Sequence, residues 1–339
     1  MTRYTHTLSM SIGGDLSRSG GGSLPAANRS VEGANPYLIE GPALISFSGG
    51  RTSAYMLHQT LEAYDGKLPD DVHVTFANTG KEREETLRFV HECGSRWGVR
   101  VRWLEWQDRE GRKTPAEDRF TEVGYNSAAR NGEPFEALIR RKRYLPNAVT
   151  RFCTAELKID TMKQFMLAQG YKHWTNVVGL RHDEGHRLLK QYARNALGNE
   201  RWQSYMPLDK ARVSKRGHIM PFWLGENIDP RNPTHPLPQG FDLGLRDYEG
   251  NCDGCMLKGF DVLAFQERER PGYLDGWIGM EGTVSALGAR PTGARFVTEY
   301  SYRDIKAHAQ HPLLIPLDWQ SLPEIGECGT ACAPDQEAA

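Results

Sequence analysis

The cysteines are the side chains of this sequence with the clearest chemical potential. Cys252 and Cys255 form a Cys-x-x-Cys pair in a glycine-containing loop, and this spacing lets two thiolates bind one metal ion or one edge of an iron–sulfur cluster. Cys153 supplies a third thiolate if the fold brings it to the same place. The pattern leaves three interpretations open: an iron–sulfur site with three cysteine ligands, a structural zinc ion, and free or redox-active thiols.

The other cysteines have different surroundings. Cys93 lies on the apolar side of a predicted helix, which is typical of a core thiol. Cys328 and Cys332 lie near the C-terminus, at a Cys-x-x-x-Cys spacing that could form an internal disulfide. The alternative is two incidental thiols. Six cysteines in 339 residues are too few for a disulfide framework.

A second set of residues is suited to binding phosphate. An apolar run over residues 43–47 predicts a buried strand, and a helical pattern begins near residue 54. Glycines between them let backbone N–H groups approach an anion, and the helix N-terminus favours negative charge. An ordinary glycine-containing loop is the alternative. The candidate phosphate-binding residues are Ser48, Gly49, Gly50, Arg51, Thr52 and Ser53.

The elements that must position these residues alternate between strand and helix. Residues 72–77 and 99–106 predict further strands, and residues 84–97 predict an amphipathic helix. This order predicts an α/β fold with a doubly wound, mostly parallel, Rossmann-like sheet, and a smaller helical C-terminal extension. Ligands of such sheets bind beyond the carboxyl ends of the strands, where both glycine-bearing turns fall.

Composition sets the domain limits and excludes some partners. We expect a disordered Ser/Gly-rich tail over residues 1–36, a nucleotide-binding α/β domain over 37–250, and a cysteine-containing, largely helical region over 251–339. The net charge of -1 gives no overall attraction to nucleic acid or membranes. No apolar run is long enough to span a bilayer and no secretory signal is present, so the expected location is cytoplasmic, without a membrane partner.

Four segments resemble the phosphoadenosine phosphosulfate (PAPS) reductase family of the PP-loop, or adenine nucleotide α-hydrolase, superfamily. Residues 48–53 resemble the loop Ser-Gly-Gly-x-Asp-Ser, with Thr52 in place of Asp. Residues 77–86 resemble an Asp-Thr-Gly…Glu-Thr segment. Residues 151–159 are similar to a Cys-Cys-x-x-x-Lys stretch, with Phe152 in place of the first Cys, and residues 178–184 to Gly-x-Arg-x-x-Glu.

The resemblance implies an adenylyl nucleotide, PAPS or ATP, across the carboxyl edge of the sheet. Its phosphates would lie on residues 48–53 and its adenosine near Asn78, Thr79 and Gly80. Arg181 and Lys158, the candidate catalytic cations, and Arg151 would contact phosphate or sulfate oxygens. Asp183 and Glu184 could hold Mg²⁺, or could instead orient Arg181.

The implied chemistry concerns sulfur, with two enzymatic forms. One is reduction of a sulfonucleotide, with Cys328 as nucleophile and a thioredoxin-like thiol reductant, because residues 327–329 resemble the family's Glu-Cys-Gly-x-His tail without its His. The other is ATP-dependent sulfur transfer to a tRNA or DNA base, through a 4Fe-4S cluster with three cysteine ligands and one open iron. A nucleotide-binding or zinc-stabilised interaction protein without catalysis is the alternative of another class.

Two basic stretches could bind a nucleic-acid substrate if both line the mouth of the site. The first covers residues 140–144. A solvated surface is the alternative interpretation of both stretches. The second stretch contains Arg194, Arg201, Trp202, Lys210, Arg212, Lys215 and Arg216.

Overall fold

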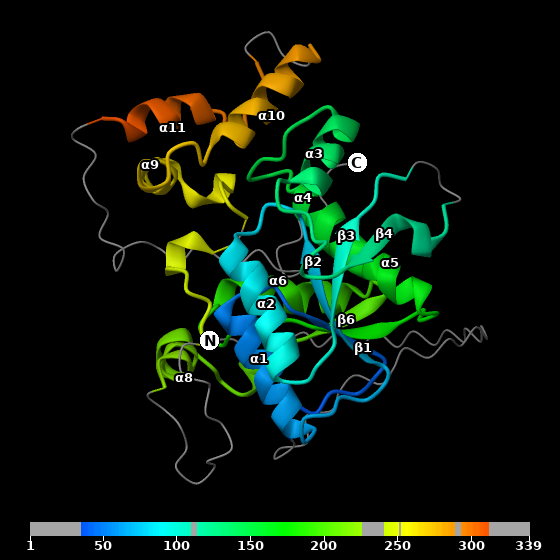
Figure 1. Ribbon diagram of the computed structural model, residues 1–339. Coiled ribbons are helices and arrows are strands. Elements are labelled where there is room, and N and C mark those ends of the chain that lie inside the picture. Colours follow the sequence, from blue (N-terminus) through cyan, green and yellow to red (C-terminus); the bar gives the residue numbers. More distant parts are fainter. Residues whose placement is uncertain (1–34, 110–113, 226–240, 251, 289–292, 312–339) are drawn as a thin grey trace, which may run out of the picture. The chain divides into compact units, whose positions relative to one another are not determined.

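A six-stranded sheet forms the centre of the computed structural model, which describes residues 35–109, 114–225, 241–250, 252–288 and 293–311 (Figure 1). The strand order is β4-β3-β2-β1-β5-β6, and only the pairing of β4 with β3 is antiparallel. The strands are β1 (Ala43–Ser46), β2 (Val72–Asn78), β3 (Val101–Trp106), β4 (Phe120–Val123), β5 (Trp174–Val177) and β6 (Trp202–Tyr205).

Helices connect the strands and continue after the last one, which confirms the predicted fold class. The α-helices are α1 (Arg51–Ala63), α2 (Glu84–Arg96), α3 (Glu133–Lys142), α4 (Phe152–Thr154), α5 (Thr161–Ala168), α6 (Gly185–Leu197), α7 (Pro207–Lys210), α8 (Met220–Leu224), α9 (Phe260–Glu269), α10 (Asp275–Ala286) and α11 (Tyr302–Ala309). Two π-helical turns are η2 (Ala155–Asp160) and η3 (Lys215–Ile219), and three 3-10 turns are η1 (Ala116–Arg119), η4 (Asp247–Glu249) and η5 (Met256–Lys258).

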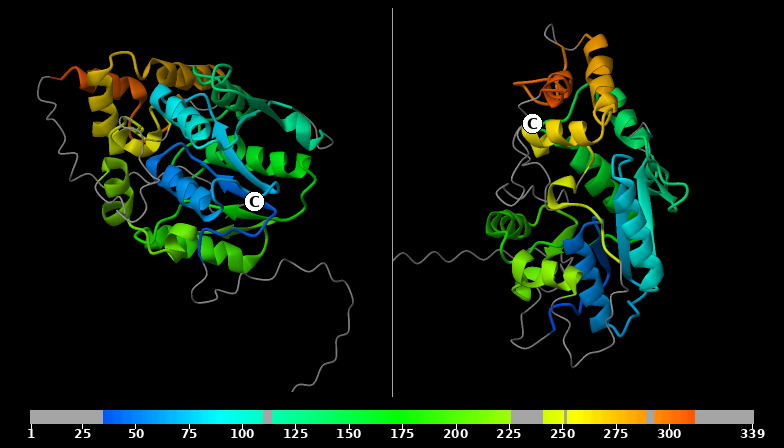
Figure 2. Two further views of the ribbon diagram at one scale, coloured as in Figure 1. Left: turned by 60° about the horizontal axis from the view of Figure 1, so that its bottom comes forward. Right: turned by 60° about the vertical axis from the view of Figure 1, so that its left-hand side comes forward.

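Alternation of side chains along the strands divides the core into two layers. Ile45 packs with α1 and α2 on one face of the sheet, whereas its neighbour Leu44 packs with α5 on the other. Figure 2 shows these helices from two further directions. Because both faces are covered, β1 is buried along its whole length, as parallel strands usually are.

The chain reverses its winding direction at β1. This strand pairs with β2 on one side and with β5 on the other. A crevice opens at such a switch point beyond the carboxyl ends of the two strands, and it is the usual ligand position in open α/β sheets. The residues after Ser46 and after Val177 are therefore placed to meet a ligand.

A second core lies at one end of the sheet. There α3 and the C-terminal helices α9, α10 and α11 gather (Figure 1). The buried side chains that they share include Phe135 from α3, Trp277 from α10, Tyr302 from α11, and both Cys252 and Cys255. The helical C-terminal region thus packs directly against the predicted nucleotide-binding part.

Several sequence predictions fall outside the described residues. They are the tail up to residue 34 and both C-terminal cysteines, Cys328 and Cys332. Within the described ranges, no helix has the length and apolar character that crossing a membrane requires.

Candidate nucleotide and cysteine site

The residues after β1 form a tight loop that ends at the start of α1. The Ser53 hydroxyl lies 3.2 Å from the backbone N of Ser48 and 2.9 Å from its Oγ, and it donates to the carbonyl of Gly50 at 3.0 Å. Gly50 is the N-cap residue of α1. The first N–H groups of α1 therefore point out of the loop, where the helix dipole favours an anion.

Gly49 lets this loop pack against α2. Its φ of +79° is one that residues with side chains rarely adopt. A Cβ atom here would lie 2.7 Å from Cγ2 of Thr86 and 2.9 Å from Cγ2 of Val90. Gly49 is thus required both by backbone conformation and by the close approach of α2.

Arg51 is held by a carboxylate from a distant part of the chain. Its guanidinium donates to both oxygens of Asp242, at 2.8 and 2.7 Å. Burial raises the pKa of Asp242, but the hydrogen bonds and charge of Arg51, with backbone N–H groups, outweigh it and hold this pKa below its usual value. Arg51, predicted to bind phosphate, is here an anchor for the segment 241–250.

Arg181 joins the end of β5 to α1. Its side chain is buried, and its Nη1 lies 3.3 Å from the Thr52 hydroxyl. Its Nε donates to Asp183 at 2.9 Å, and Glu184 lies 3.6 Å from Nη1. Of the two predicted roles for these carboxylates, the geometry matches the orientation of Arg181.

The second turn is fixed by a buried network. The Asn78 amide donates to Glu105 at 2.6 Å and to the Ala129 carbonyl at 2.9 Å, and its oxygen accepts from the N–H of Gly80. Ala129 also donates its backbone N–H to Glu105, at 2.7 Å. Asn78 thus ties β2 to β3 and sets the direction of the turn.

Glu82 connects this turn with two predicted site residues. Its carboxylate accepts from the backbone N of Thr79 at 2.8 Å and from the Thr79 hydroxyl at 2.9 Å. Its Oε1 also lies 3.5 Å from the Lys158 ammonium and 3.9 Å from Sγ of Cys252. Glu82 was not predicted from the sequence, because nothing in its local pattern separates it from the neighbouring glutamates.

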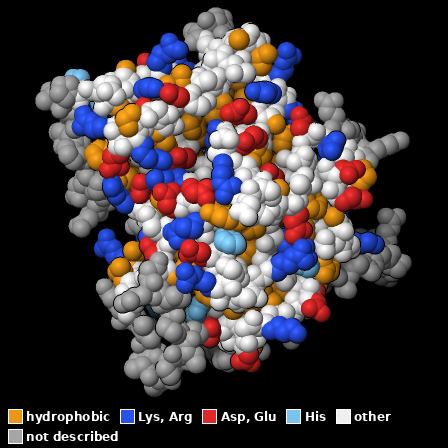
Figure 3. Space-filling model, in the orientation of Figure 1, with side chains coloured by type: hydrophobic (Ala, Val, Ile, Leu, Met, Phe, Trp, Pro, Cys, Tyr) orange, Lys and Arg blue, Asp and Glu red, His pale blue; other side chains and the backbone are white. Residues whose placement is uncertain are grey.

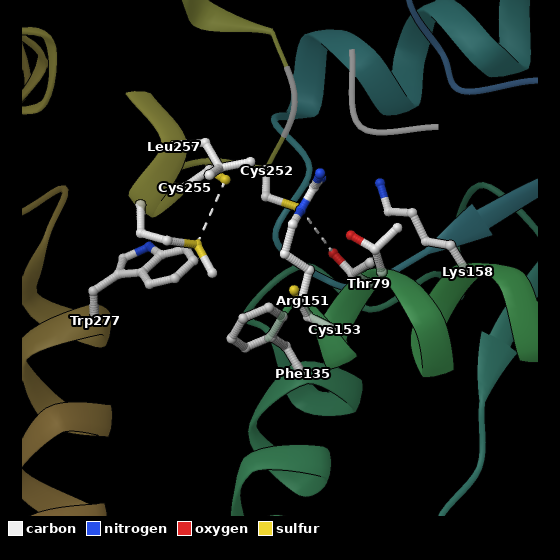
Figure 4. Close-up of a pocket in the computed structure, with 11 residues that line it drawn as sticks. Thr79, Phe135, Arg151, Cys153, Lys158, Cys252, Cys255, Leu257 and Trp277 are labelled. Carbon is white, nitrogen blue, oxygen red and sulfur yellow. Dashed lines mark hydrogen bonds between the residues drawn. The ribbon is translucent and has the colours of Figure 1, made fainter. Parts of the chain in front are cut away.

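The three predicted cysteine ligands line one pocket (Figure 4). The pocket encloses about 380 Å³, part of it open to solvent. Cys153 and Lys158 enter from the helical segment α4–η2, and Cys252 and Cys255 from the opposite wall. The remaining lining residues are Thr79, Phe135, Arg151, Thr154, Met256, Leu257 and Trp277.

Comparison with known proteins agrees with this geometry. Residues 42–208, which include the loop, the second turn and Arg181, match the model of the phosphoadenosine phosphosulfate reductase domain. The chain belongs to the PAPS reductase family. This family membership gives a PP-loop fold that binds adenine nucleotides.

Two relatives of this PAPS reductase family protein are uncharacterized. A stretch of 241 residues is 26% identical to the nin region protein ORF290 of Escherichia phage lambda, and it covers 68% of this chain and 70% of that protein. A shorter stretch of 84 residues is 34% identical to protein MJ0066 of Methanocaldococcus jannaschii, covering 24% of this chain and 17% of that protein. No solved structure matches the chain significantly.

The side chains that line the pocket are of types that could bind a metal ion or an iron–sulfur cluster, although the three thiols do not together form a metal-binding group. Among the described residues, no three His, Cys, Asp or Glu side chains form a group that could hold a metal ion. Three thiols nevertheless line one pocket with Arg151 and Lys158, whose positive charges would offset thiolate charge. Cys93 is buried in the main core, as predicted.

The basic stretches of this PAPS reductase family protein are far apart along the sheet. The stretch 140–144 lies at the C-terminal end of α3, which packs with Trp106 of β3. The second basic stretch surrounds β6, the strand at the opposite edge of the sheet from β4. Acidic and basic side chains are interspersed on the face shown in Figure 3. Cations of the first stretch also form ion pairs: Arg140 with Glu136, Arg141 with Asp108, and Lys142 with Glu156.

Proposed function

We propose that this protein is an enzyme that binds an adenylyl nucleotide on residues 48–53 and carries out sulfur chemistry in the adjoining cysteine pocket. The observation that supports this most directly is the position of Thr79. It belongs to the predicted adenosine-side turn, it lines the pocket, and its hydroxyl lies 3.6 Å from Sγ of Cys252. The nucleotide and the thiols would therefore both contact the turn that contains Thr79.

The chain's own groups would supply mainly electrostatic catalysis. Backbone N–H groups at the start of α1 would bind the phosphates without rearranging, and preorganised dipoles of this kind lower the energy of developing charge. Arg181 is already oriented by Asp183 and Glu184. Lys158 and Arg151 would face the sulfur-bearing end of the substrate, since both line the pocket.

The thiols would act in one of two reactions. Family membership favours reduction of a sulfonucleotide. In that reaction a cysteine thiolate attacks the sulfonate sulfur, the S–O bond breaks and the nucleotide leaves, and a dithiol reductant then displaces sulfite from the cysteine while the dithiol is oxidised to a disulfide. The pocket itself favours ATP-driven sulfur transfer to a nucleic-acid base, because Cys153, Cys252 and Cys255 all line it. A 4Fe-4S cluster on these thiolates would supply an open iron that carries sulfide.

Anaerobic purification with iron, sulfide and zinc analysis tests the role of the pocket. We expect iron and sulfide in the wild type and their loss in Cys153→Ser and Cys252→Ser. Cys93→Ala is the matched control, because Cys93 lies in the core away from the pocket. Stoichiometric zinc without iron would support the interaction-protein alternative and contradict the cluster.

Product analysis separates the two reactions. Sulfite released from PAPS in the presence of a thiol reductant identifies reduction, and pyrophosphate released from ATP in the presence of RNA or DNA identifies the adenylating route. Both should fail in Gly49→Ala. Tight nucleotide binding without either product would reject the enzymatic proposal.

A further inference from the structure

The turn between Cys252 and Cys255 is held from outside by the C-terminal helices. At its centre, Gly254 has a φ of +72°. A Cβ atom at Gly254 would lie 2.2 Å from Nε1 of Trp277, so the indole ring packs directly on the turn. The backbone of the Cys-x-x-Cys pair therefore adopts a conformation that the helices leave little room to change.

Two tyrosine hydroxyls form hydrogen bonds with the backbone of Gly254, one with its carbonyl and the other with its N–H. The Tyr302 hydroxyl, from the first residue of α11, donates to the Gly254 carbonyl at 2.6 Å. The Gly254 N–H donates to the hydroxyl of Tyr273, which itself donates to Gln266 of α9 at 2.8 Å. Both backbone groups of Gly254 are thus hydrogen-bonded, one to a side chain of α11 and the other to a side chain of the loop between α9 and α10.

Asp253, the residue before Gly254, also forms hydrogen bonds that fix its position. Its carboxylate forms two hydrogen bonds with Arg270, at 3.3 and 3.0 Å, and its backbone N donates to the Lys81 carbonyl at 2.6 Å. Both residues between the thiols are therefore fixed. Free rotation of this turn would change the direction of both Sγ atoms, so these contacts bear on the geometry of the pocket.

Tyr302 is central to this arrangement. It is 0% exposed, and its ring stacks on Trp277 with centroids 5.5 Å apart and an interplanar angle of 13°. Trp277 in turn lines the cysteine pocket. One residue of α11 thus supports the turn both by a buried hydrogen bond and through the aromatic ring behind it.

We propose that Tyr302 is a positioning residue that fixes the direction of the Cys252 and Cys255 thiols, and that α9, α10 and α11 serve as the scaffold of this turn. The inference rests on the proposed function only in giving those thiols a chemical role. A site built from side chains on a short turn needs such support, because the reactive geometry tolerates errors of only about half an ångström.

Tyr302→Phe tests the proposal, since it keeps the ring and removes only the hydroxyl. The measurement is the rate at which iodoacetamide alkylates each cysteine of the full-length chain, after a chelator has removed any metal bound to the thiols, followed by mass spectrometry. We expect Cys252 and Cys255 to react about tenfold faster, because a buried carbonyl loses its donor, while Cys93 is unchanged. Tyr273→Phe should give the same selective change.

The matched control is Tyr300→Phe, whose ring packs on Phe260 and which forms no hydrogen bond with the turn. Unchanged rates in Tyr302→Phe, or an equal rise at all cysteines including Cys93, would overturn the proposal. Alkylation requires neither nucleotide nor turnover. A protein that shows the selective change but no sulfur chemistry would therefore refute the proposed function and leave the positioning role intact.

Discussion

At the level of single residues, the nucleotide loop depends on the absence of a side chain at residue 49. The positive φ of Gly49 and its approach to Thr86 and Val90 are independent constraints. A side chain at residue 49 would overlap Thr86 and Val90 even if the backbone could adopt the positive φ without strain. Gly49 would therefore contribute to the proposed nucleotide binding through the shape of the loop, since it has no side chain that could contact the ligand.

We expect Gly49→Ala to lower the free energy of unfolding by about 2–4 kcal/mol, as the sum of backbone strain and steric overlap. Nucleotide binding should be lost, as measured by calorimetry with ATP. Gly66→Ala is the control, since Gly66 has a φ of +84° with no atom near its missing Cβ. Its cost should be only about 1–2 kcal/mol, and equal costs for the two variants would contradict the steric argument.

The candidate loop residues and the three cysteines of the pocket were predicted from the sequence, but their partners were not. Ser48, Gly49 and Ser53 could be found because phosphate binding needs a local pattern of glycines and hydroxyls. Glu82 and Asp242 could not, since each acts through a residue distant in sequence: Lys158 for one and Arg51 for the other.

At the level of elements, the segment 241–250 is tied to the starts of α1 and α2. Asp242 binds Arg51, and the carbonyls of Asp242 and Leu243 accept from Arg88 at 2.9 and 3.2 Å. Further along, Glu249 pairs with Arg83. This segment spans the distance from the nucleotide loop to the residues before the Cys-x-x-Cys turn.

Asp242→Asn should destabilise the protein by about 1 kcal/mol at pH 7, because the pair is partly exposed and screened by solvent. The lowered pKa of Asp242 means that the carboxylate stabilises the fold above its unfolded pKa of about 3.9, and less as pH falls through the folded value. Urea unfolding of both proteins should therefore converge below about pH 4. A difference that grows on acidification would contradict the ion pair.

The strands β1, β2 and β3 and the helices α1 and α2 were predicted within a few residues, because each carries a clear apolar pattern, whereas the parallel strand β6 was not predicted. The antiparallel strand β4 (Phe120–Val123) was not predicted. It is a short edge strand with half-buried and exposed side chains, and it has no apolar signature of its own. The hydrogen bonds with β3 hold this segment as a strand, although its own sequence has no strand pattern.

At the level of the whole molecule, the second core joins the C-terminal helices to the sheet and contains a buried charge. Lys258 is 3% exposed, and its ammonium donates to the Glu249 carbonyl at 3.2 Å. Burial lowers the pKa of Lys258, against the opposing charges of Asp253 and the two thiols. The folded state therefore disfavours the protonated form.

Lys258→Met should gain stability relative to the wild type as pH falls from about 10 to 7. The reason is that below the unfolded pKa of about 10.4 the unfolded wild-type chain binds a proton at Lys258, whereas burial makes the folded state bind it only at lower pH. Thermal unfolding across this range measures the difference. Lys210→Met, on the exposed part of α7, controls for the loss of one charge. A difference that is constant with pH would show that Lys258 is not penalised by burial.

The π-helical turn η2, which begins two residues after Cys153 and contains Lys158, has a consequence for chain length. Each residue of an α-helix advances the chain by about 100° around its axis, and a π-turn accommodates one residue more than an α-turn. Deleting one residue from η2 would therefore restore regular α-helix while leaving Cys153 at nearly the same angle relative to α5, whereas the same deletion in an α-helix would rotate its two ends by about 100° relative to each other. The chain can thus lose one residue in this turn without turning Cys153 out of the pocket.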